Sequence, residues 1–372
     1  MNPLRFRTIY RRADLVSRSL PMVSSLQYLN PDACFDLVAD PSTLGRAFMI
    51  GMFVLRPGSK RFDPDFLRVP DDAAAAIHGD YDWVYGVQGF SGPARVISNS
   101  SPFDAYRVAL HYGVVDAVLV GSGTACAEGI SSVTSAGYLW QPQFVCAWSH
   151  LQSADKDMLK KINEQRKEWQ NIGLLSPRKN PAQLVFTASG RPRNGPDFLQ
   201  CRVFHDRDQD GRRIEAYILT SALGADEIRS RAKLFGLAGR INDMLVIVPP
   251  RPGHSSDDID ITLIPEILFK KLDIRLVNHD GGRRLMEEFI KGGAIDQLHL
   301  TLGMRYSVED LIARFHDNDG AEKNVSDFQY FFHNGKRDFP HSVPGCLEVV
   351  SVLSDEAQDV AYAILKPSNL QG

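Results

Sequence analysis

The stretch "HDGGRRLMEEFIKGGAIDQLHLTL", residues 279–302, holds a glycine pair at 281–282 between two segments of different periodicity. In the segment before the pair, 273–280, Ile274, Leu276 and Val277 make a short and mostly apolar run, which predicts a buried strand. The segment after it has apolar residues at helical spacing from 285 to 290, and a second glycine pair ends it at 292–293. The stretch therefore predicts a strand, a glycine turn, a helix and a further strand, which is the repeating pattern of an α/β fold.

The first glycine pair has two interpretations. Glycines at a helix N-terminus let an anion approach the free backbone N–H groups and the positive end of the helix dipole. The turn is then a candidate phosphate site, with Arg283 and Arg284 next to it. The alternative is a tight turn with solvent-facing arginines, because many glycine turns are only turns. This stretch alone leaves both interpretations open.

From residue 46 onward the chain alternates apolar runs with amphipathic segments, which predicts an α/β fold. We expect three layers, α/β/α, around a mixed and mostly parallel sheet, with a closing antiparallel hairpin at 346–366. Helices are expected at 100–113 and 264–272. The other expected strands are 46–55, 115–124, 182–190, 213–222 and 243–250.

Two similar joins, at 113–120 and 293–300, place a glycine, two apolar residues and an aspartate before an alternating strand. The glycine should end a helix, and the aspartate should turn the chain into the strand. Between about 127 and 180 the pattern breaks, and we expect an irregular and helical insertion there. Its charged helix, 153–173, is expected to be a solvated surface rather than a partner site.

The length of 372 residues allows one large domain or two. No segment is a convincing linker, so we expect one domain over 46–372 after an N-terminal extension, 1–45. Residues 1–30 carry five arginines and a single acidic residue, a composition that organelle transit peptides also have. An extension that packs on the body of the protein is the favoured alternative, with a cytoplasmic location.

The overall composition excludes several classes of protein. A net charge of -3 argues against a general nucleic-acid binder, which needs a basic footprint for the phosphate backbone. The five cysteines are an odd number, are widely spread and form no CxxC, so neither a disulfide framework nor a zinc site is indicated. The longest apolar run, 47–55, is far shorter than the ~20 residues that span a bilayer. We therefore expect no membrane partner.

Motifs for common chemistries are also absent. "GSGTAC" at 121–126 begins like a dinucleotide fingerprint but has Cys126 in place of the third glycine, and no acidic residue follows a second strand at the expected distance. "DRDQDGRRI" at 206–214 begins like a calcium loop but has Tyr217 at position 12, so a hairpin turn is favoured. The histidines show no metal-ligand spacing, and no nucleophile elbow exists. An enzyme whose cofactor carries the reaction fits this pattern.

Three segments together resemble the reductase domain of riboflavin biosynthesis, which has a dihydrofolate-reductase-like fold. They are "VDAVLVGSGT" (115–124), "AYILTS" (216–221) and the stretch 280–302. In that family one strand ends in a Val-Gly-small-Gly-Thr turn, a later strand ends in an acid and two glycines, and the helix that follows leads to a hydrophobic-Asp-x-Leu-x-Leu strand. The three segments occur here in the expected order, discontinuously over about 46–366.

The resemblance implies that NADPH binds across the strand ends and that a hydride is transferred to a phosphoribosylamino-pyrimidine or a related imine or carbonyl substrate. It implies a small-molecule substrate and, as in other members, a homodimer. On the substrate side the candidates are Arg56, Ser98, Asn99 and Asp104. The residues that the resemblance assigns to the cofactor are Gly121, Ser122, Gly123, Thr124, Thr220, Ser221, Asp280, Gly281, Gly282, Arg283 and Arg284. No metal is expected.

The sequence departs from the family where the substrate should bind. The family's Ser-Leu-Asp-Gly turn is replaced by Arg-Pro-Gly-Ser at 56–59, and Cys126 stands where arginine is common. Two functions therefore remain open: an NADPH-dependent reductase, or a non-catalytic nucleotide-binding or interaction protein on the same fold. The reductase is favoured, because altered substrate motifs indicate a changed substrate as readily as a lost one.

Overall fold

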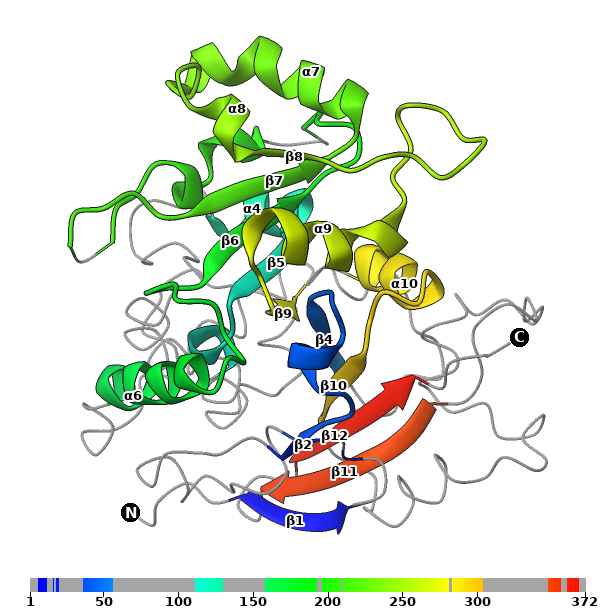
Figure 1. The fold of residues 1–372 in the computed structure, drawn as a ribbon. Helices are drawn as coiled ribbons and strands as arrows, with labels where there is room; N and C mark the ends of the chain where they lie inside the picture. Colours follow the sequence, from blue (N-terminus) through cyan, green and yellow to red (C-terminus); the bar gives the residue numbers. More distant parts are fainter. Residues whose placement is uncertain are drawn as a thin grey trace, which may run out of the picture. The chain divides into compact units, whose positions relative to one another are not determined.

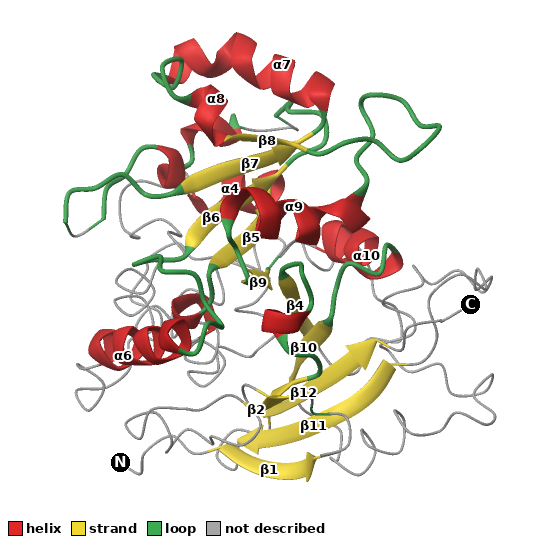
Figure 2. Cartoon of the chain, viewed as in Figure 1, coloured by secondary structure: helices red, strands yellow, loops and turns green. Residues whose placement is uncertain are grey.

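A computed structural model describes part of the chain, drawn in colour in Figure 1 and by secondary structure in Figure 2. The chain divides into two compact units, and the segments of one unit alternate along the sequence with those of the other. One unit takes 1–40, 50–108 and 295–372, and the other takes 41–49 and 109–294. The described residues are 6–11, 16, 18–19, 36–55, 111–129, 158–192, 196–208, 210–280, 283–303, 347–355 and 360–367.

The unit built mainly from 109–294 contains five neighbouring parallel strands. Their order is β9 (Leu276–His279), β5 (Ala117–Gly121), β6 (Ala182–Phe186), β7 (Ala216–Thr220) and β8 (Leu245–Ile247). β5 and β9 are buried along nearly their whole length, which explains why β5 is apolar at nearly every position rather than alternating. The predicted α/β class is confirmed.

The helices that connect these strands lie on both faces of the sheet. In Figure 1, α9 is drawn in front of β5 and β6, and α4 is drawn behind them. Residues 111–114 are helical and lead into β5, so the end of the expected helix at 100–113 is present. The helices are α4 (Ser122–Gly129), α6 (Met158–Asn171), α7 (Ala222–Ala232), α8 (Ile241–Met244), α9 (Ile264–Leu272) and α10 (Arg283–Lys291), with 3-10 turns η3 (Pro41–Thr43), η6 (Phe198–Gln200), η7 (Arg202–Phe204), η8 (Lys233–Phe235) and η9 (Ile261–Leu263).

The other unit contains most of β4 (Phe48–Leu55), which pairs in parallel with β10 (Gln297–Gly303). β10 pairs antiparallel with β12 (Val360–Pro367), which pairs antiparallel with β11 (Leu347–Asp355). Residues 356–359, between these two strands, lie outside the described part. The N-terminal segment contributes β1 (Phe6–Arg11), which pairs antiparallel with β11, and the two-residue strands β2 (Arg18–Ser19) and β3 (Asp36–Leu37) pair with each other.

Several expected boundaries were wrong. The strand expected at 115–124 ends at Gly121, because Ser122 begins helix α4 and the small polar residues form its first turn. The strand expected at 182–190 ends at Phe186, and that at 213–222 is limited to 216–220 because Ser221 caps α7. The strand at 243–250 is reduced to 245–247, since its first residues belong to α8.

The prediction that the charged helix is a solvated surface was wrong for one of its faces. α6 buries Ile162, Gln165, Arg166 and Trp169, each no more than 2% exposed. The charge of Arg166 is compensated by main-chain carbonyl groups and a carboxylate that lie far away in the sequence. In the part of the chain that is described, no helix has both the length and the apolar character needed to cross a bilayer.

Candidate functional site

The carboxyl ends of β5 and β9 bring two helix N-termini together. α4 starts immediately after Gly121, and three residues, 280–282, separate the end of β9 from the start of α10. β5 and β9 are adjacent and parallel, with Leu119 opposite His279. A Cβ atom on Gly121 would lie 3.5 Å from a methyl group of Leu285, in the first turn of α10, so the two helix starts are neighbours in space. Helix N-termini carry free N–H groups and partial positive charge, which suits an anion.

The first turn of α4 is accessible. Gly123 is exposed, and a Cβ atom placed on it would meet no atom within 4 Å. Ser122 and Thr124 are partly exposed on either side of it. The predicted Gly-Ser-Gly-Thr residues therefore form the start of a helix with open space around it, rather than the extended turn that the sequence suggested.

Asp280, at the end of β9, makes contacts through both its main chain and its side chain. Its main-chain N–H donates to the carbonyl oxygen of Leu119 at 2.9 Å, which continues the pairing with β5. The hydroxyl of Tyr112 donates to its carboxylate Oδ2. Gly281 and Gly282 lie outside the described residues, and for Arg283 and Arg284 the structure describes the helical backbone of α10 only. The substrate-side candidates Arg56, Ser98, Asn99 and Asp104 also lie outside the described residues.

Thr220 and Ser221 lie at the end of β7, and both side chains are fully buried. The Ser221 hydroxyl caps α7 by accepting from the N–H of Gly224 at 2.9 Å, and it donates to the carbonyl oxygen of Ala188 at 2.8 Å. The Thr220 hydroxyl reaches the same carbonyl oxygen at 3.4 Å. These two hydroxyl groups therefore hold the loop after β6 against α7. Because the Ser221 side chain caps α7, a side chain of the protein already occupies the N-terminus of this helix.

Two polar side chains in β9 were not singled out by the sequence reasoning. Asn278 and His279 are both fully buried, and neither has a hydrogen-bond partner among the described residues. The His279 ring packs against Phe289 of α10, with 4.5 Å between the ring centres. Burial lowers the pKa of His279 to about 3, so the imidazole is neutral at physiological pH. The available signal was the presence of two polar residues inside an otherwise apolar strand.

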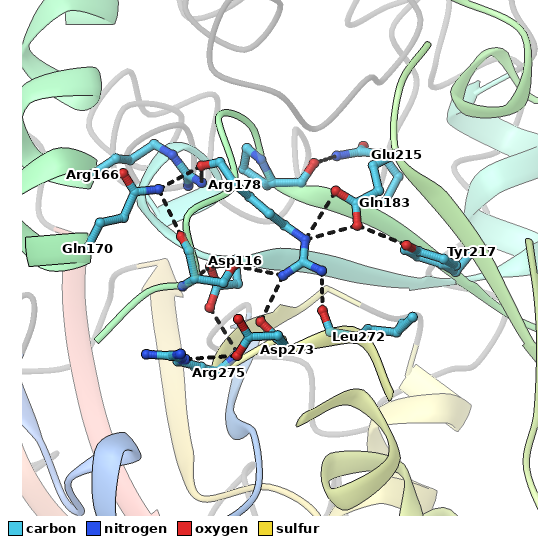
Figure 3. A network of polar contacts seen from close by, with 12 residues as sticks. Asp116, Arg166, Gln170, Arg178, Gln183, Glu215, Tyr217, Leu272, Asp273 and Arg275 are labelled. Atoms are coloured by element: carbon cyan, nitrogen blue, oxygen red, sulfur yellow. Dashed lines mark hydrogen bonds and ion pairs between the residues drawn. The ribbon is translucent and has the colours of Figure 1, made fainter. Parts of the chain in front are cut away.

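A larger group of polar side chains lies at the opposite, amino ends of the same strands (Figure 3). At its centre is Asp116, whose carboxylate accepts from the main-chain N–H groups of Ser176 at 3.0 Å, Arg275 at 2.9 Å and Leu276 at 3.3 Å. The Ser176 hydroxyl donates to it at 2.8 Å. Burial raises the pKa of Asp116, while the N–H of Arg275, the Ser176 hydroxyl and the charge of Arg166 oppose that rise. The predicted role of this aspartate in turning the chain into its strand is confirmed.

Two arginines complete this group. Arg166 donates to the carbonyl oxygens of Gly113 and Arg178, each at 3.0 Å, and burial lowers its pKa to about 10, so it keeps its charge at neutral pH. Arg178 makes a two-pronged contact with Glu215, at 2.9 and 3.1 Å. Its guanidinium also donates to the carbonyl oxygen of Asp273 at 2.8 Å. These contacts join the starts of β5, β7 and β9, and their role is structural.

Among the described residues, no group of three or more His, Cys, Asp or Glu side chains is placed to hold a metal ion. Cys126 and Cys201 are free thiols in the same part of the chain. Cys126 is partly exposed in α4 and its thiol reaches the carbonyl oxygen of Pro196 at 3.3 Å. Burial raises the pKa of Cys201 to about 12, so that thiol is not a nucleophile at neutral pH.

Comparison with known proteins gives matches at the level of structure only. No family model matches the chain, and no curated protein sequence matches it. The matches among solved structures are to riboflavin-biosynthesis reductases and a related protein, the group of proteins that the sequence resembles. The chain is thus similar to these proteins, at low sequence identity.

Three of the matches span most of this chain. A pyrimidine reductase-like protein from Corynebacterium diphtheriae has 14% identity and a TM-score of 0.44, over 87% of this chain and 92% of that one. The riboflavin biosynthesis reductase Rib7 from Saccharomyces cerevisiae has 10% identity and a TM-score of 0.38, over 87% and 91%. RibD from Acinetobacter baumannii has 10% identity and a TM-score of 0.39, and the match spans only 59% of RibD. At these values the activity of this chain has to be argued from its own residues.

Proposed function

We propose that the unit built mainly from 109–294 binds NADPH and that the chain is an NADPH-dependent reductase of the dihydrofolate-reductase-like type. The observation that carries the proposal is the meeting of the α4 and α10 N-termini at the carboxyl ends of two adjacent parallel strands. In open α/β sheets, ligands bind outside the carboxyl ends of the strands, and helix N-termini there bind phosphate groups.

The residues present fit a dinucleotide. The open space around Gly123 admits a phosphate to the first N–H groups of α4, while Ser122 and Thr124 supply hydroxyl groups beside it. The glycine pair at 281–282 and Arg283 or Arg284 are proposed for the pyrophosphate at α10. Thr220 and Ser221 are proposed to shape the adenosine side through the loop they hold, because their own hydroxyl groups are engaged in that contact.

Bound NADPH would supply the hydride, and the protein would contribute mainly binding and orientation. The proposed substrate is a pyrimidine-ribosylamine or a related imine or carbonyl compound, and the residues proposed to bind it are Arg56, Ser98, Asn99 and Asp104. The runner-up is a nucleotide-binding or interaction protein without turnover, which the replacement of the family's substrate turn at 56–59 favours. The two functions share the cofactor site and differ in whether NADPH is oxidised.

The test is NADPH binding, measured by intrinsic-fluorescence titration, for the parent chain and two variants at one position. Gly123→Ala adds a methyl group where there is room, so it should bind within about twofold of the parent. Gly123→Asp adds a carboxylate at the proposed phosphate position, and binding should weaken by at least about tenfold through charge repulsion. Circular dichroism checks that both variants fold.

Three outcomes are informative. Loss of affinity in Gly123→Asp alone supports the cofactor site, and oxidation of NADPH with pyrimidine-ribosylamine substrates would then separate the reductase from the non-catalytic alternative. Equal binding by Gly123→Asp would place the cofactor elsewhere. A parent chain that does not bind NADPH at millimolar concentration would contradict the proposed function.

A further inference from the structure

The loop that follows β6 carries an exposed arginine at the same edge of the sheet as the proposed phosphate site. Phe186, the last residue of β6, pairs with Gly121, the last residue of β5, so this loop and the first turn of α4 start from adjacent strand ends. In this loop the side chain of Arg191 is 72% exposed. An exposed guanidinium at this edge attracts the anionic groups of a dinucleotide that binds there.

Contacts with α7 hold the main chain just before Arg191. The carbonyl oxygen of Ala188 accepts from the Ser221 hydroxyl at 2.8 Å. The guanidinium of Arg231, in the last turn of α7, donates to the carbonyl oxygen of Gly190. The Arg191 side chain therefore extends from a main chain whose position is already set, which lowers the entropy cost of binding a ligand there.

Two arginines lie beside Glu227 of α7, and they differ in their other contacts. Arg231 is only 17% exposed and also forms an ion pair with Asp197, so its guanidinium is used in holding the loop. In the described part of the chain, Arg191 forms an ion pair with Glu227 alone, at 3.4 Å. Exposed ion pairs contribute little to stability, so Arg191 exchanges this carboxylate for a phosphate group at small cost.

We propose, on the basis of the function above, that Arg191 binds the phosphate group on the adenosine ribose of NADPH and so selects NADPH over NADH. Thr220 and Ser221, which are proposed for the adenosine side, hold the loop that carries this arginine. With the pyrophosphate at α4 and α10 and the adenosine toward β7, the ribose lies at the end of β6, the strand between β5 and β7. A guanidinium forms paired, charge-assisted hydrogen bonds with a phosphate group, and a nearby arginine accommodates this phosphate in other dinucleotide sites.

The experiment measures dissociation constants for NADPH and NADH, and for the adenosine nucleotides with and without the ribose phosphate. Arg191→Gln should weaken the two ligands that carry the ribose phosphate by roughly tenfold or more, the usual effect of losing a charge-assisted hydrogen bond. The two ligands without it should bind within about twofold of the parent. Higher salt should weaken NADPH binding more in the parent than in Arg191→Gln, because salt screens an exposed charge.

Glu227→Gln and Arg229→Gln are the comparison variants. Glu227→Gln removes the carboxylate that competes for Arg191, so it should bind NADPH as tightly as the parent or more tightly. Arg229→Gln removes the same charge from another exposed arginine, one that pairs with Asp226 at 2.7 Å, and it should keep the parent's preference for NADPH. Thermal unfolding of every variant measures the loss of stability separately from the loss of affinity.

The outcomes separate this inference from the proposed function. If the parent binds NADPH and Arg191→Gln binds it equally well, the role of Arg191 is wrong and the cofactor site stands. If Arg191→Gln weakens NADPH and NADH to the same extent, Arg191 acts on the whole site rather than on the ribose phosphate, which also overturns the inference. A parent chain with equal affinity for NADPH and NADH has no preference for Arg191 to cause. If the parent binds neither dinucleotide, both the inference and the proposed function fail.

Discussion

Gly190 and Gly224 are in direct backbone contact. A Cβ atom on Gly190 would lie 2.9 Å from the carbonyl carbon of Gly224, and Gly190 has a left-handed backbone with a φ of 67°. A Cβ atom on Gly224 would in turn overlap the Thr220 hydroxyl and the carbonyl oxygen of Ala188. The loop after β6 can therefore approach the start of α7 only because both positions lack a side chain.

We expect Gly224→Ala to lower the free energy of unfolding by about 1–3 kcal/mol, the usual cost of overpacking a closely packed site. The new methyl group must push the loop away and break the hydrogen bonds of Ser221 with Ala188. Chemical denaturation measures the change. Gly239→Ala is the control, because a Cβ atom there meets nothing within 4 Å. A Gly224→Ala protein as stable as this control would mean that the loop is not held against α7.

Asp116 leads to a second prediction, because three main-chain N–H groups point at its carboxylate. Asp116→Asn replaces one acceptor oxygen by an NH₂ group that faces a donor, and it leaves Arg166 without its carboxylate. We expect the free energy of unfolding to fall by about 3–5 kcal/mol, as when one partner of a buried charge pair is removed. Glu266→Gln breaks an exposed helix pair with Lys270 and should cost no more than about 0.5 kcal/mol. Similar losses in the two variants would contradict a central role for Asp116.

The sequence predicted the α/β class, the helix after the glycine pair at 281–282 and the aspartate that leads into β5. These features are determined locally, by apolar periodicity, glycine and a polar residue at a join. The same local reasoning placed strand ends too late at Ser122 and Ser221. A serine that follows a strand can extend it or start a helix, and the choice depends on packing partners elsewhere in the chain.

The buried face of α6 could not be predicted for a related reason. Arg166 bonds to carbonyl oxygens about fifty residues earlier in the chain, so its sequence neighbours reveal only a charged helix. Thr220 and Ser221 were correctly placed at a strand end, but their contact with Ala188 depends on the meeting of Gly190 and Gly224. The side chains of Asn278 and His279 have no hydrogen-bond partner among the described residues, and they follow the apolar Leu276 and Val277 in the same strand. Such breaks in a local pattern are where local rules and function tend to conflict.

His279 makes the stability of the protein sensitive to acid. Its pKa is about 3 in the folded chain, because burial disfavours the charged ring, whereas an unfolded histidine titrates near 6.5. Between these two values the unfolded chain binds a proton that the folded chain does not, so the free energy of unfolding falls as the pH falls. The slope from this one group approaches about 1.4 kcal/mol per pH unit below pH 6.5.

We expect His279→Leu to remove this slope between pH 6.5 and the acid limit of folding, and to be at least as stable as the parent at pH 7. The leucine fills the space against Phe289 and leaves no buried nitrogen without a partner. Urea denaturation at half-unit pH intervals measures the slope for the parent, for His279→Leu and for His254→Gln, which changes an exposed histidine. If His279→Leu keeps the acid slope of the parent, His279 does not cause that slope, and its pKa is not lowered in the folded chain.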